Sequence, residues 1–598
     1  MARAEFSHPQ SSSLPERSLP SFAEAGRAVW LAGLLFLSLA QAAMAQPGAT
    51  PADDALRRAV SDYQALSDAR NPNETQAWPD HSAEAIAAYR SALETVRDRL
   101  AGLAPEDFSE EDRLTLEILR WKLGLDLEEI AFGTERMPFI AGDGFFTTPT
   151  YVAGVTVIRD REDAEAWLDR IARLPDFYDQ AVANMRRGIA DGFVQNVGTA
   201  RSALDMMEAA YRLPAAEDPL VTPFGTRPPT IDPAAWQGYI DRATALVETD
   251  VRPAQARAIA FFTSDYVPNA RAELGASALP NGRAYYAYLV RRNTGSTMTP
   301  DDVFALGEAE IVRIRAEMEA EIERAGFDGS FGDFLTYLRT NPDFYAEDIE
   351  DALEKASEIA KRADFLLPQY FELLPRLTYG VRLKPAELEG TSGAYFLGDP
   401  EAGIAGSVMM GRNAHLGPLY DLPAWVLHEG VPGHHLQIAL GQERDDLPAF
   451  RRSDDITVFV EGWALYAERL GVEMGIYQTP YENFGRLSFE MWRACRLVMD
   501  VGIHWRGWSF EEAARCLREN TALPEHTIDG ETRRYIGWPG QALAYKVGEV
   551  EIVRLRQRAE AALGPDFDLR AFHTMLIGSG AMPMSILSDR TDRWIAAQ

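Results

Sequence analysis

Three histidines and one glutamate are concentrated in the stretch "HEGVPGHH", which contains His428, Glu429, His434 and His435. In many zinc enzymes two histidines four residues apart on one helix bind the metal ion, and a glutamate directly after the first acts on the metal-bound water. Here the residue four positions after His428 is Pro432, and the other two histidines come later. The stretch therefore indicates a metal-binding motif that contains two extra residues.

The spacing sets a geometric condition on this motif. On an uninterrupted α-helix, His434 would lie about 240° around the axis and roughly 9 Å along it from His428, so the two could not share one ion. Proline removes a backbone donor, and glycine permits unusual dihedral angles. We expect a bulge at Val431-Pro432-Gly433 that brings the second histidine toward the first. The alternative is that Pro-Gly ends one helix and starts the next, and leaves the histidines exposed.

A third metal ligand is expected on the next helical segment. Glu461 opens "EGWALYAERL", 27 residues after His434, and the preceding "ITVFV" is apolar, so Glu461 belongs to a buried helix. A buried carboxylate is costly unless it is paired or bound to a metal. Glu468 lies seven residues further along the same helical face and could support the ligands or be solvated.

The segments that must position these residues have helical patterns. "SAEAIAAYRSALETVRDRLAGL" carries apolar residues at three- and four-residue spacing, and Thr299 is an N-cap residue type before a long helical stretch. Between about Tyr379 and Gly411 glycines become frequent, and "SGAYFL" and "GSVMMG" resemble short strands. We therefore predict a mainly α fold with a small antiparallel sheet beside the helix of His428. An edge strand in that position could pair with a peptide substrate.

The same patterns give a domain organisation. Residues 46–298 form an N-terminal helical region, and residues 299–598 form a C-terminal region that contains the metal motif. We expect the two regions to be one continuous globule.

Four segments carry a resemblance to a known family. They are "HEGVPGHHLQ", "VEGWALYAERL", "RACRLVMDVGIHWRGWS" and "PGQALAYKVGEVEIVRLRQRA". They resemble the bacterial family called domain of unknown function 885 (DUF885), from about Ala55 to the C-terminus and most strongly from Gly390 onward. That family is in turn similar to the gluzincin metallopeptidases, whose folds are long, helical and channel-like.

The resemblance implies a large helical metallopeptidase-like fold, a zinc cofactor and a peptidase-type reaction. It also implies His428, His434 and Glu461 as the metal ligands. Matching "GHH" to the Gly-His of related peptidases selects His434, and His435 remains the alternative second histidine.

A second group of polar residues lies on the segment "SFEMWRACRLVMDVGIHWRGW". Arg493, Arg496, Asp500 and His504 fall at steps of three and four, so they form one stripe on an otherwise apolar helix. Such a stripe must face partners or a water-filled cavity. In the functional interpretation it is an active-site wall, with Arg493 or Arg496 on a substrate carboxylate and Asp500 orienting His504. The alternative is an internal salt-bridge network between helices.

The segment "ETRRYIGWPGQALAYKVG" supplies further candidates. Related zinc peptidases use a tyrosine, and often a histidine, to stabilise the oxyanion at the scissile carbonyl. Tyr545 is the first candidate for that role and Tyr535 the second, although both could be ordinary core residues. Gln541 and Lys546 could bind a substrate carboxylate, or Lys546 could be a solvated charge. Three residues before the metal motif could also line the cleft: Tyr395, Asn413 and His415.

Composition limits the classes of function. The 598 residues are 46% apolar and 25% charged, which is enough to bury a large core. The net charge of −31 argues against a nucleic-acid binder, because such proteins usually present a basic surface.

The N-terminus has the pattern of a secretory signal peptide at residues 1–45. Arg27 precedes the apolar run "AVWLAGLLFLSLAQAAMA", which ends in an A-x-A cleavage pattern before Gln46. The alternative is a membrane anchor, but the run is short and Gln41 interrupts it. We therefore expect a periplasmic or secreted protein without stable membrane insertion. Its two cysteines, Cys495 and Cys516, could form a disulfide in that compartment or remain buried thiols.

These observations favour an exported zinc metallopeptidase that cleaves peptides. Glu429 would act as general base, and Tyr545, with His504, would stabilise the oxyanion. A zinc amidase or esterase acting on small or cell-wall-derived substrates would use the same core residues. A non-catalytic metal-binding or scaffold protein is the third hypothesis, although it would have no need of Glu429.

Overall fold

The computed structural model describes residues 50–598, apart from residues 72, 74–76, 386–392, 401 and 453–455. Residues Ala52–Gln598 form one compact unit. The signal peptide predicted at residues 1–45 lies outside the described residues. Within the described part of the chain, no helix combines the length and the apolar character needed to cross a membrane.

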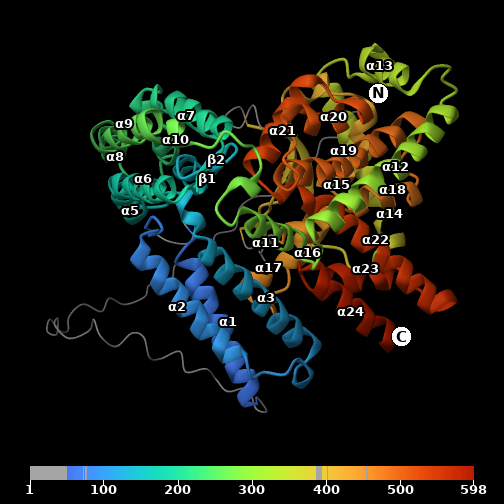
Figure 1. Ribbon diagram of the computed structural model, residues 1–598, viewed down its shortest axis with the longest axis horizontal. Coiled ribbons are helices and arrows are strands. Elements are labelled where there is room, and N and C mark those ends of the chain that lie inside the picture. The colour runs from blue at the N-terminus through green and yellow to red at the C-terminus, as the bar shows by residue number, and fades with distance from the viewer. Residues whose placement is uncertain (1–49, 72, 74–76, 386–392, 401, 453–455) are drawn as a thin grey trace, which may run out of the picture. The chain divides into compact units, whose positions relative to one another are not determined.

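The first half of the compact unit consists of helices, coloured blue to green in Figure 1. They include α1 (Pro51–Asp68), α2 (Ala83–Leu100), α3 (Glu110–Phe132), α5 (Arg161–Ala172), α6 (Leu174–Asp191), α7 (Val197–Tyr211), α8 (Pro233–Leu246), α9 (Arg252–Phe261) and α11 (Gly282–Thr294). The helices α5 to α9 enclose a core of their own that is rich in aromatic side chains, including Phe145, Tyr178 and Phe262. A two-stranded antiparallel sheet, β1 (Phe139–Ile140) and β2 (Asp143–Gly144), lies beside this group.

The second half carries the longer helices. They include α12 (Pro300–Arg324), α14 (Ile349–Tyr370), α18 (Thr457–Glu473), α19 (Pro480–His504), α20 (Phe510–Asn520), α21 (Glu525–Gly537), α22 (Ala544–Leu563), α23 (Leu569–Ile577) and α24 (Met584–Ala597). Thr299 caps α12 as predicted, and the Asp302 carboxylate accepts the Thr299 backbone N–H in return. Helix α12 packs along α19, and α18 packs along α22. The predicted mainly α fold is confirmed.

A close approach between two helices depends on a pair of glycines. A Cβ at Gly462 of α18 would lie 2.5 Å from Gly548 Cα, and a Cβ at Gly548 of α22 would lie 2.1 Å from the backbone oxygen of Val458. Any side chain there would force the helices apart. Gly462 directly follows Glu461, and Gly548 comes three residues after Tyr545, so this contact brings those two side chains to one place.

A three-stranded sheet precedes the histidine motif. Its strands are β3 (Tyr379–Leu383), β4 (Ala394–Phe396) and β5 (Gly406–Met410), in the order β3-β5-β4. Strand β4 pairs with β5 in the antiparallel sense that was expected, whereas β3 pairs with β5 in parallel, so the sheet is mixed. Every residue of β5 is buried, and β4 forms one edge.

The histidine motif is divided between two helices. Helix α15 (Leu422–Glu429) ends at the glutamate, and α16 (His434–Gln442) begins at the second histidine. The helix is interrupted, as in the Pro-Gly alternative, but the histidines are buried and not exposed. The ring centroids of His428 and His434 lie 4.6 Å apart, so the bend brings the second histidine toward the first as expected. The N–H of Gly433 donates to the carbonyl of Leu427 at 3.0 Å, which folds the chain back on itself. Only glycine fits at this position, since a Cβ would lie 2.1 Å from the backbone oxygen of His428.

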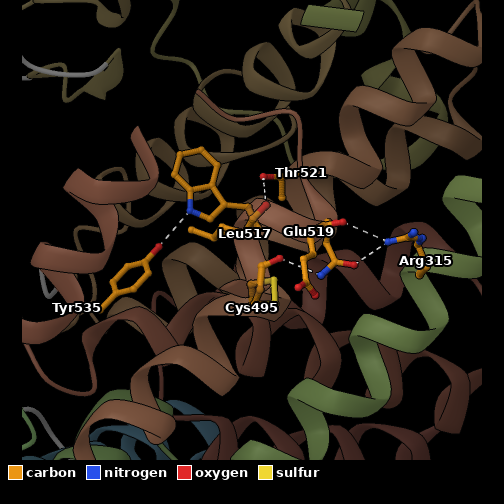
Figure 2. Close-up of a disulfide and its surroundings, with 9 residues drawn as sticks. Arg315, Cys495, Leu517, Glu519, Thr521 and Tyr535 are labelled. Atoms are coloured by element: carbon orange, nitrogen blue, oxygen red, sulfur yellow. Dashed lines mark hydrogen bonds between the residues drawn. A yellow bond between two sulfur atoms is a disulfide. The ribbon is translucent and has the colours of Figure 1, made fainter. Parts of the chain in front are cut away.

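The two cysteines form a disulfide, so the open alternative of buried thiols is excluded. Cys495 of α19 and Cys516 of α20 have Cα atoms 5.7 Å apart, and the two cysteines are 21 positions apart in the sequence. Figure 2 shows the disulfide beside the side chains of Leu517 and Thr521. The bond fixes α20 against α19, the helix that carries the predicted polar stripe.

Candidate metal centre

Three side chains from three helices converge near the four residues that connect α15 and α16. Nitrogen atoms of His428 (α15) and His434 (α16) and a carboxylate oxygen of Glu461 (α18) all lie within 4.8 Å of one another. Glu461 Oε2 is 3.3 Å from His428 Nε2 and 3.7 Å from His434 Nε2. The histidine ring centroids are 4.6 Å apart. Although the motif is split, its first and second histidines face a common point.

The second histidine of the cluster is His434. His435 points elsewhere, because its Nδ1 lies 3.0 Å from the Tyr395 hydroxyl and its Nε2 lies 3.0 Å from the carbonyl oxygen of Leu377. Both ring nitrogens of His435 therefore already have partners from outside the motif.

A buried carboxylate fixes the orientation of the first histidine. His428 Nδ1 lies 2.8 Å from Glu468 Oε1, and both side chains are almost fully buried. A carboxylate in this position holds the proton on Nδ1 and leaves the lone pair of Nε2 directed at the cluster. Glu468 thus orients a candidate ligand, and is not the solvated residue that its sequence position also allowed.

The charges in this region favour a bound cation. Burial lowers the pKa of His428, but the neighbouring carboxylates of Glu461 and Glu468 outweigh it and raise the pKa to about 10. Burial raises the pKa of Glu461, yet the neighbouring histidines and the Tyr545 hydroxyl lower it to about 2. At neutral pH the His428 ring therefore carries a proton on Nε2 as well, and a cation bound between His428 and Glu461 would displace that proton.

The donor set and its unused atoms fit a metal ion. Two imidazole nitrogens and one carboxylate are the ligand types of catalytic zinc sites, which keep a fourth position open. Glu461 Oε2 is buried and has no hydrogen-bond partner among the described residues. An unpaired buried carboxylate oxygen is costly, so an ion at this point would satisfy it. His428, His434 and Glu461 are the residues that could hold such an ion.

Glu429 lies next to the cluster. It is 8% exposed, and its Oε2 accepts the backbone N–H of Tyr395 from the edge strand β4 at 2.7 Å. Burial raises the pKa of its carboxyl to about 7. The short sheet thus holds the Glu429 side chain in place through β4. The Glu429 carboxyl could exchange a proton near neutral pH.

The cluster opens into a cleft of about 830 Å³. His428, Glu429, His434, Glu461 and Tyr545 all line it. The other walls include residues of β4, α15, α16, α17 (Ala449–Arg452), α19 and α21, among them the aromatic residues Tyr395, Trp425, Phe489 and Trp492. The Tyr545 hydroxyl lies close enough to Glu461 to lower the pKa of that carboxyl, and its role in stabilising an oxyanion stays a prediction.

The polar stripe of α19 divides into two parts. Arg493 and Arg496 line the cleft, as the active-site interpretation requires. Asp500 instead accepts the Tyr286 hydroxyl at 2.6 Å and the backbone N–H of Gly540, and it does not orient His504. The second half of the stripe thus joins helices, as the alternative interpretation proposed.

His504 does not belong to the cleft. Its Nδ1 accepts the backbone N–H of Ala276 at 2.9 Å, and its Nε2 lies 2.9 Å from the carbonyl oxygen of Tyr535. Burial lowers its pKa to about 3, so the ring is neutral. The predicted catalytic role for His504 is corrected to a structural one, because both nitrogens are used by backbone groups.

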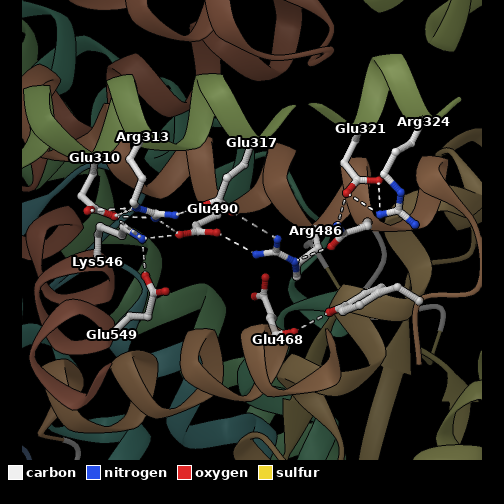
Figure 3. Close-up of polar contacts among 12 residues, drawn as sticks. Glu310, Arg313, Glu317, Glu321, Arg324, Glu468, Arg486, Glu490, Lys546 and Glu549 are labelled. Carbon is white, nitrogen blue, oxygen red and sulfur yellow. Dashed lines mark hydrogen bonds and ion pairs between the residues drawn. The ribbon is translucent and has the colours of Figure 1, made fainter. Parts of the chain in front are cut away.

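Lys546 is also corrected, because it points into a buried ion cluster. Figure 3 shows its ammonium group among three carboxylates, with Glu490 at 2.7 Å, Glu310 at 3.0 Å and Glu549 as the third. The side chain is completely buried and cannot reach a substrate. This cluster joins α12, α19 and α22 instead.

Tyr535 and Gln541 lie behind the cleft wall. Among the described residues, neither lines the cleft. The Tyr535 hydroxyl accepts Arg496 Nε at 2.8 Å, and Gln541 Oε1 accepts Arg534 Nη1 at 3.1 Å. Both residues therefore contact arginines of the wall from behind it, and the structure does not bring them to the cleft surface where a substrate-binding role was predicted.

Several lining residues were not predicted as site residues. Arg534 and Glu531 face the cleft from α21, and of the three candidates before the motif only Tyr395 lines it, without Asn413 or His415. Arg534 directly precedes the candidate Tyr535. Neighbouring residues on a helix point about 100° apart, so Arg534 and Tyr535 lie on different faces of α21. A comparison of these faces could have distinguished the cleft-lining arginine from the tyrosine behind it.

The fold and the cluster define a class: a mainly helical protein with a buried two-histidine, one-glutamate centre at the base of a cleft. The chain belongs to the family described as "Bacterial protein of unknown function (DUF885)", which matches residues 64–590. A search of curated protein sequences gave no match.

Two solved structures share the fold. One is described as a "putative lipoprotein" from Colwellia psychrerythraea, with 24% identity and a TM-score of 0.84, and the alignment covers 92% of this chain and 99% of that one. The other is described as a "putative lipoprotein of unknown function" from Shewanella oneidensis, with 16% identity, a TM-score of 0.66, and coverage of 90% and 99%. At these identities the likeness extends to the fold.

Proposed function

We propose that this protein is an exported zinc-dependent hydrolase of the gluzincin type that cleaves peptides. The observation that carries the proposal is the convergence of His428, His434 and Glu461 within 4.8 Å, with the buried Glu429 beside them at the edge of a cleft. A structural metal site has closed coordination and needs no additional carboxylate. This one opens into a cavity large enough for several residues of a peptide.

The residues divide the work of amide hydrolysis. Zinc, when bound, would supply a Lewis acid that polarises the scissile carbonyl and lowers the pKa of water. Glu429 takes the proton of the attacking water and then gives it to the leaving amine, as the C–N bond breaks and the hydroxyl stays on the acyl carbon. Tyr545 donates its hydroxyl hydrogen to the oxyanion that forms on the carbonyl oxygen. Glu468 keeps His428 in the tautomer that the ligand role requires.

Strand β4 supports the choice of a peptide as substrate. It is an edge strand, and Gly393, Ala394, Tyr395 and Leu397 line the cleft beside Glu429. Edge strands bind extended peptides through backbone hydrogen bonds. A small ester or amide would make fewer of these backbone hydrogen bonds than an extended peptide.

Two observations support export. The Cys495–Cys516 disulfide is typical of oxidising compartments, and the two structural neighbours are each described as a "putative lipoprotein". Together with the predicted signal peptide, these features support the proposal that the mature chain works in the periplasm or outside the cell.

The test is hydrolysis by purified protein of a peptide library and of a panel of small amides and esters, with and without zinc. We expect peptide cleavage that requires zinc. In the Glu429→Gln variant, kcat should fall by a factor of about 10²–10⁴, the usual contribution of a general base, while one zinc ion stays bound. Cleavage of only the small substrates would favour an amidase or esterase. Zinc binding without any hydrolysis would favour a scaffold protein.

A further inference from the structure

One wall of the cleft is basic in a protein that is otherwise acidic. The whole chain has 90 acidic and 59 basic residues. The charged residues that line the cleft, histidines aside, reverse this ratio: Glu429, Glu461, Glu531, Arg451, Arg452, Arg493, Arg496 and Arg534. The wall formed by α19 and α21 carries three of these arginines, Arg493, Arg496 and Arg534, and one glutamate, Glu531, so it has an excess of positive charge.

The positive charge on this wall is incompletely paired. Arg496 Nη2 and Arg534 Nη2 share a single carboxylate, Glu531, at 3.2 and 3.3 Å. Arg496 is 5% exposed, and its Nη1 has no hydrogen-bond partner in the described part of the chain. The Nε of Arg534 likewise lacks one. Buried guanidinium groups are normally paired, and a carboxylate matches their geometry best, so the site lacks one anionic partner.

The position of Arg496 relative to the metal centre gives the distance at which that anion would bind. The guanidinium carbon of Arg496 lies 4.4 Å from the ring centroid of Tyr545, whose hydroxyl contacts Glu461. The arginine and the centre are thus separated by one tyrosine side chain. That separation is comparable to one or two extended residues, at roughly 3.5 Å each.

Aromatic side chains lie beside the arginines and indicate which kind of substrate side chain would fit there. The guanidinium of Arg493 lies 4.8 Å from the ring of Phe489 and 5.3 Å from the ring of Trp492, and that of Arg496 lies 5.1 Å from Trp492. Phe489 and Trp492 also line the cleft. An apolar side chain fits such a wall, and an apolar residue offers a carboxylate only when it is the last residue of its chain.

We propose that Arg496 and Arg534 bind the free C-terminal carboxylate of a short peptide that ends in an apolar residue. The protein then acts as a carboxypeptidase that releases one or two residues from that end, with one water consumed for each amide bond broken. This inference rests on the peptide hydrolysis proposed above, and it goes beyond it by naming the end of the substrate that is recognised.

Calorimetry measures the binding of three acetylated tetrapeptides to the zinc-loaded Glu429→Gln protein. This variant is expected to bind peptides without cleaving them. The first ends in phenylalanine as the free acid, the second is its carboxamide, and the third is a carboxamide with glutamate as the last residue. We expect the free acid to bind roughly 10- to 100-fold more tightly than either carboxamide, because a charged hydrogen-bonded pair is lost in both. Adding Arg496→Met should remove the preference for the acid.

The control is Arg170→Met. Arg170 is similarly buried and lies over the ring of Trp78 at 4.4 Å, but it does not line the cleft. This variant should keep the preference for the free acid. Arg534→Met serves as the second test variant, since Arg534 is 26% exposed and its loss disturbs the packing less.

The outcomes separate the two proposals. Equal binding of acid and carboxamide, no binding of either, or tight binding of the glutamate carboxamide would overturn the C-terminal site. So would a preference that survives in both arginine variants. If wild-type protein hydrolyses acid and carboxamide at equal rates, the C-terminal site is wrong and the hydrolase stands. If the acid is preferred in binding but never cleaved, the carboxylate site stands and the hydrolase is wrong.

Discussion

At the scale of single residues, the cluster depends on a side chain that would not touch the metal. Glu468 is 2% exposed and holds His428 Nδ1 at 2.8 Å. Its negative charge makes the ring a stronger ligand and fixes its tautomer. The histidine and this carboxylate are 40 residues apart in sequence, yet they act as one unit.

We predict that Glu468→Gln weakens zinc binding by about 10–100-fold, because the hydrogen bond can persist but the charge is lost. Competition with a chelator of known affinity measures this change. The matched control is Glu473→Gln on the same helix, where the carboxylate pairs with Arg556 at the surface and zinc affinity should not change. Equal zinc affinity in wild type and Glu468→Gln would show that Glu468 has no role in the site.

At the scale of elements, the site exists because α18 and α22 touch. Glu461 comes from one helix and Tyr545 from the other, and the glycines at positions 462 and 548 permit the contact. The buried cluster around Lys546 holds α22 against α12 and α19 (Figure 3). The proposed metal ligand Glu461 and the proposed oxyanion donor Tyr545 are thus positioned by packing between distant segments.

We predict that Gly548→Ala lowers the free energy of unfolding by about 1–3 kcal/mol, the usual cost of an overpacked contact. It should also reduce hydrolysis, since α18 must move away from α22 and take Glu461 with it. Urea denaturation and the peptide assay measure both effects.

The control is Gly238→Ala in α8, where an added Cβ meets nothing within 4 Å. Alanine should stabilise that helix by roughly 0.5–1 kcal/mol and leave hydrolysis unchanged. If Gly548→Ala behaves like Gly238→Ala, the close helix contact is not needed for the site.

At the scale of the whole molecule, local patterns and long-range contacts differ in how far the sequence predicts them. The helical periodicity, the two strands before the motif and the cap at Thr299 depend on neighbouring residues, and they were predicted. The grouping of His428, His434 and Glu461 was implied by the family resemblance, because the residue types alone left the choice between His434 and His435 open. By contrast, His504 bonds to a backbone N–H 228 residues away, and no local pattern contains that information. The polar stripe of α19 therefore could not be divided into its cleft-lining and structural halves beforehand.

The disulfide also acts on the molecule as a whole, by restricting the unfolded chain. We predict that the double variant Cys495→Ala/Cys516→Ala loses about 2–4 kcal/mol of stability, as expected for a closed loop of this size. Urea unfolding of oxidised wild type, with and without reductant, provides the comparison. Reductant should lower the stability of wild type and leave the double variant unchanged. Identical unfolding of oxidised and reduced wild type would show that the bond does not form or does not stabilise the fold.

The central claim is that His428 and His434, which lie on two separate helices, bind one zinc ion together with Glu461. The most direct test is an anomalous difference map at the zinc edge from crystals of zinc-loaded protein. We predict one peak at about 2.0–2.2 Å from His428 Nε2, His434 Nε2 and a carboxylate oxygen of Glu461, with His435 still bonded to Leu377 and Tyr395. A map without a peak at this point, or with zinc bound to His435 instead, would contradict the account.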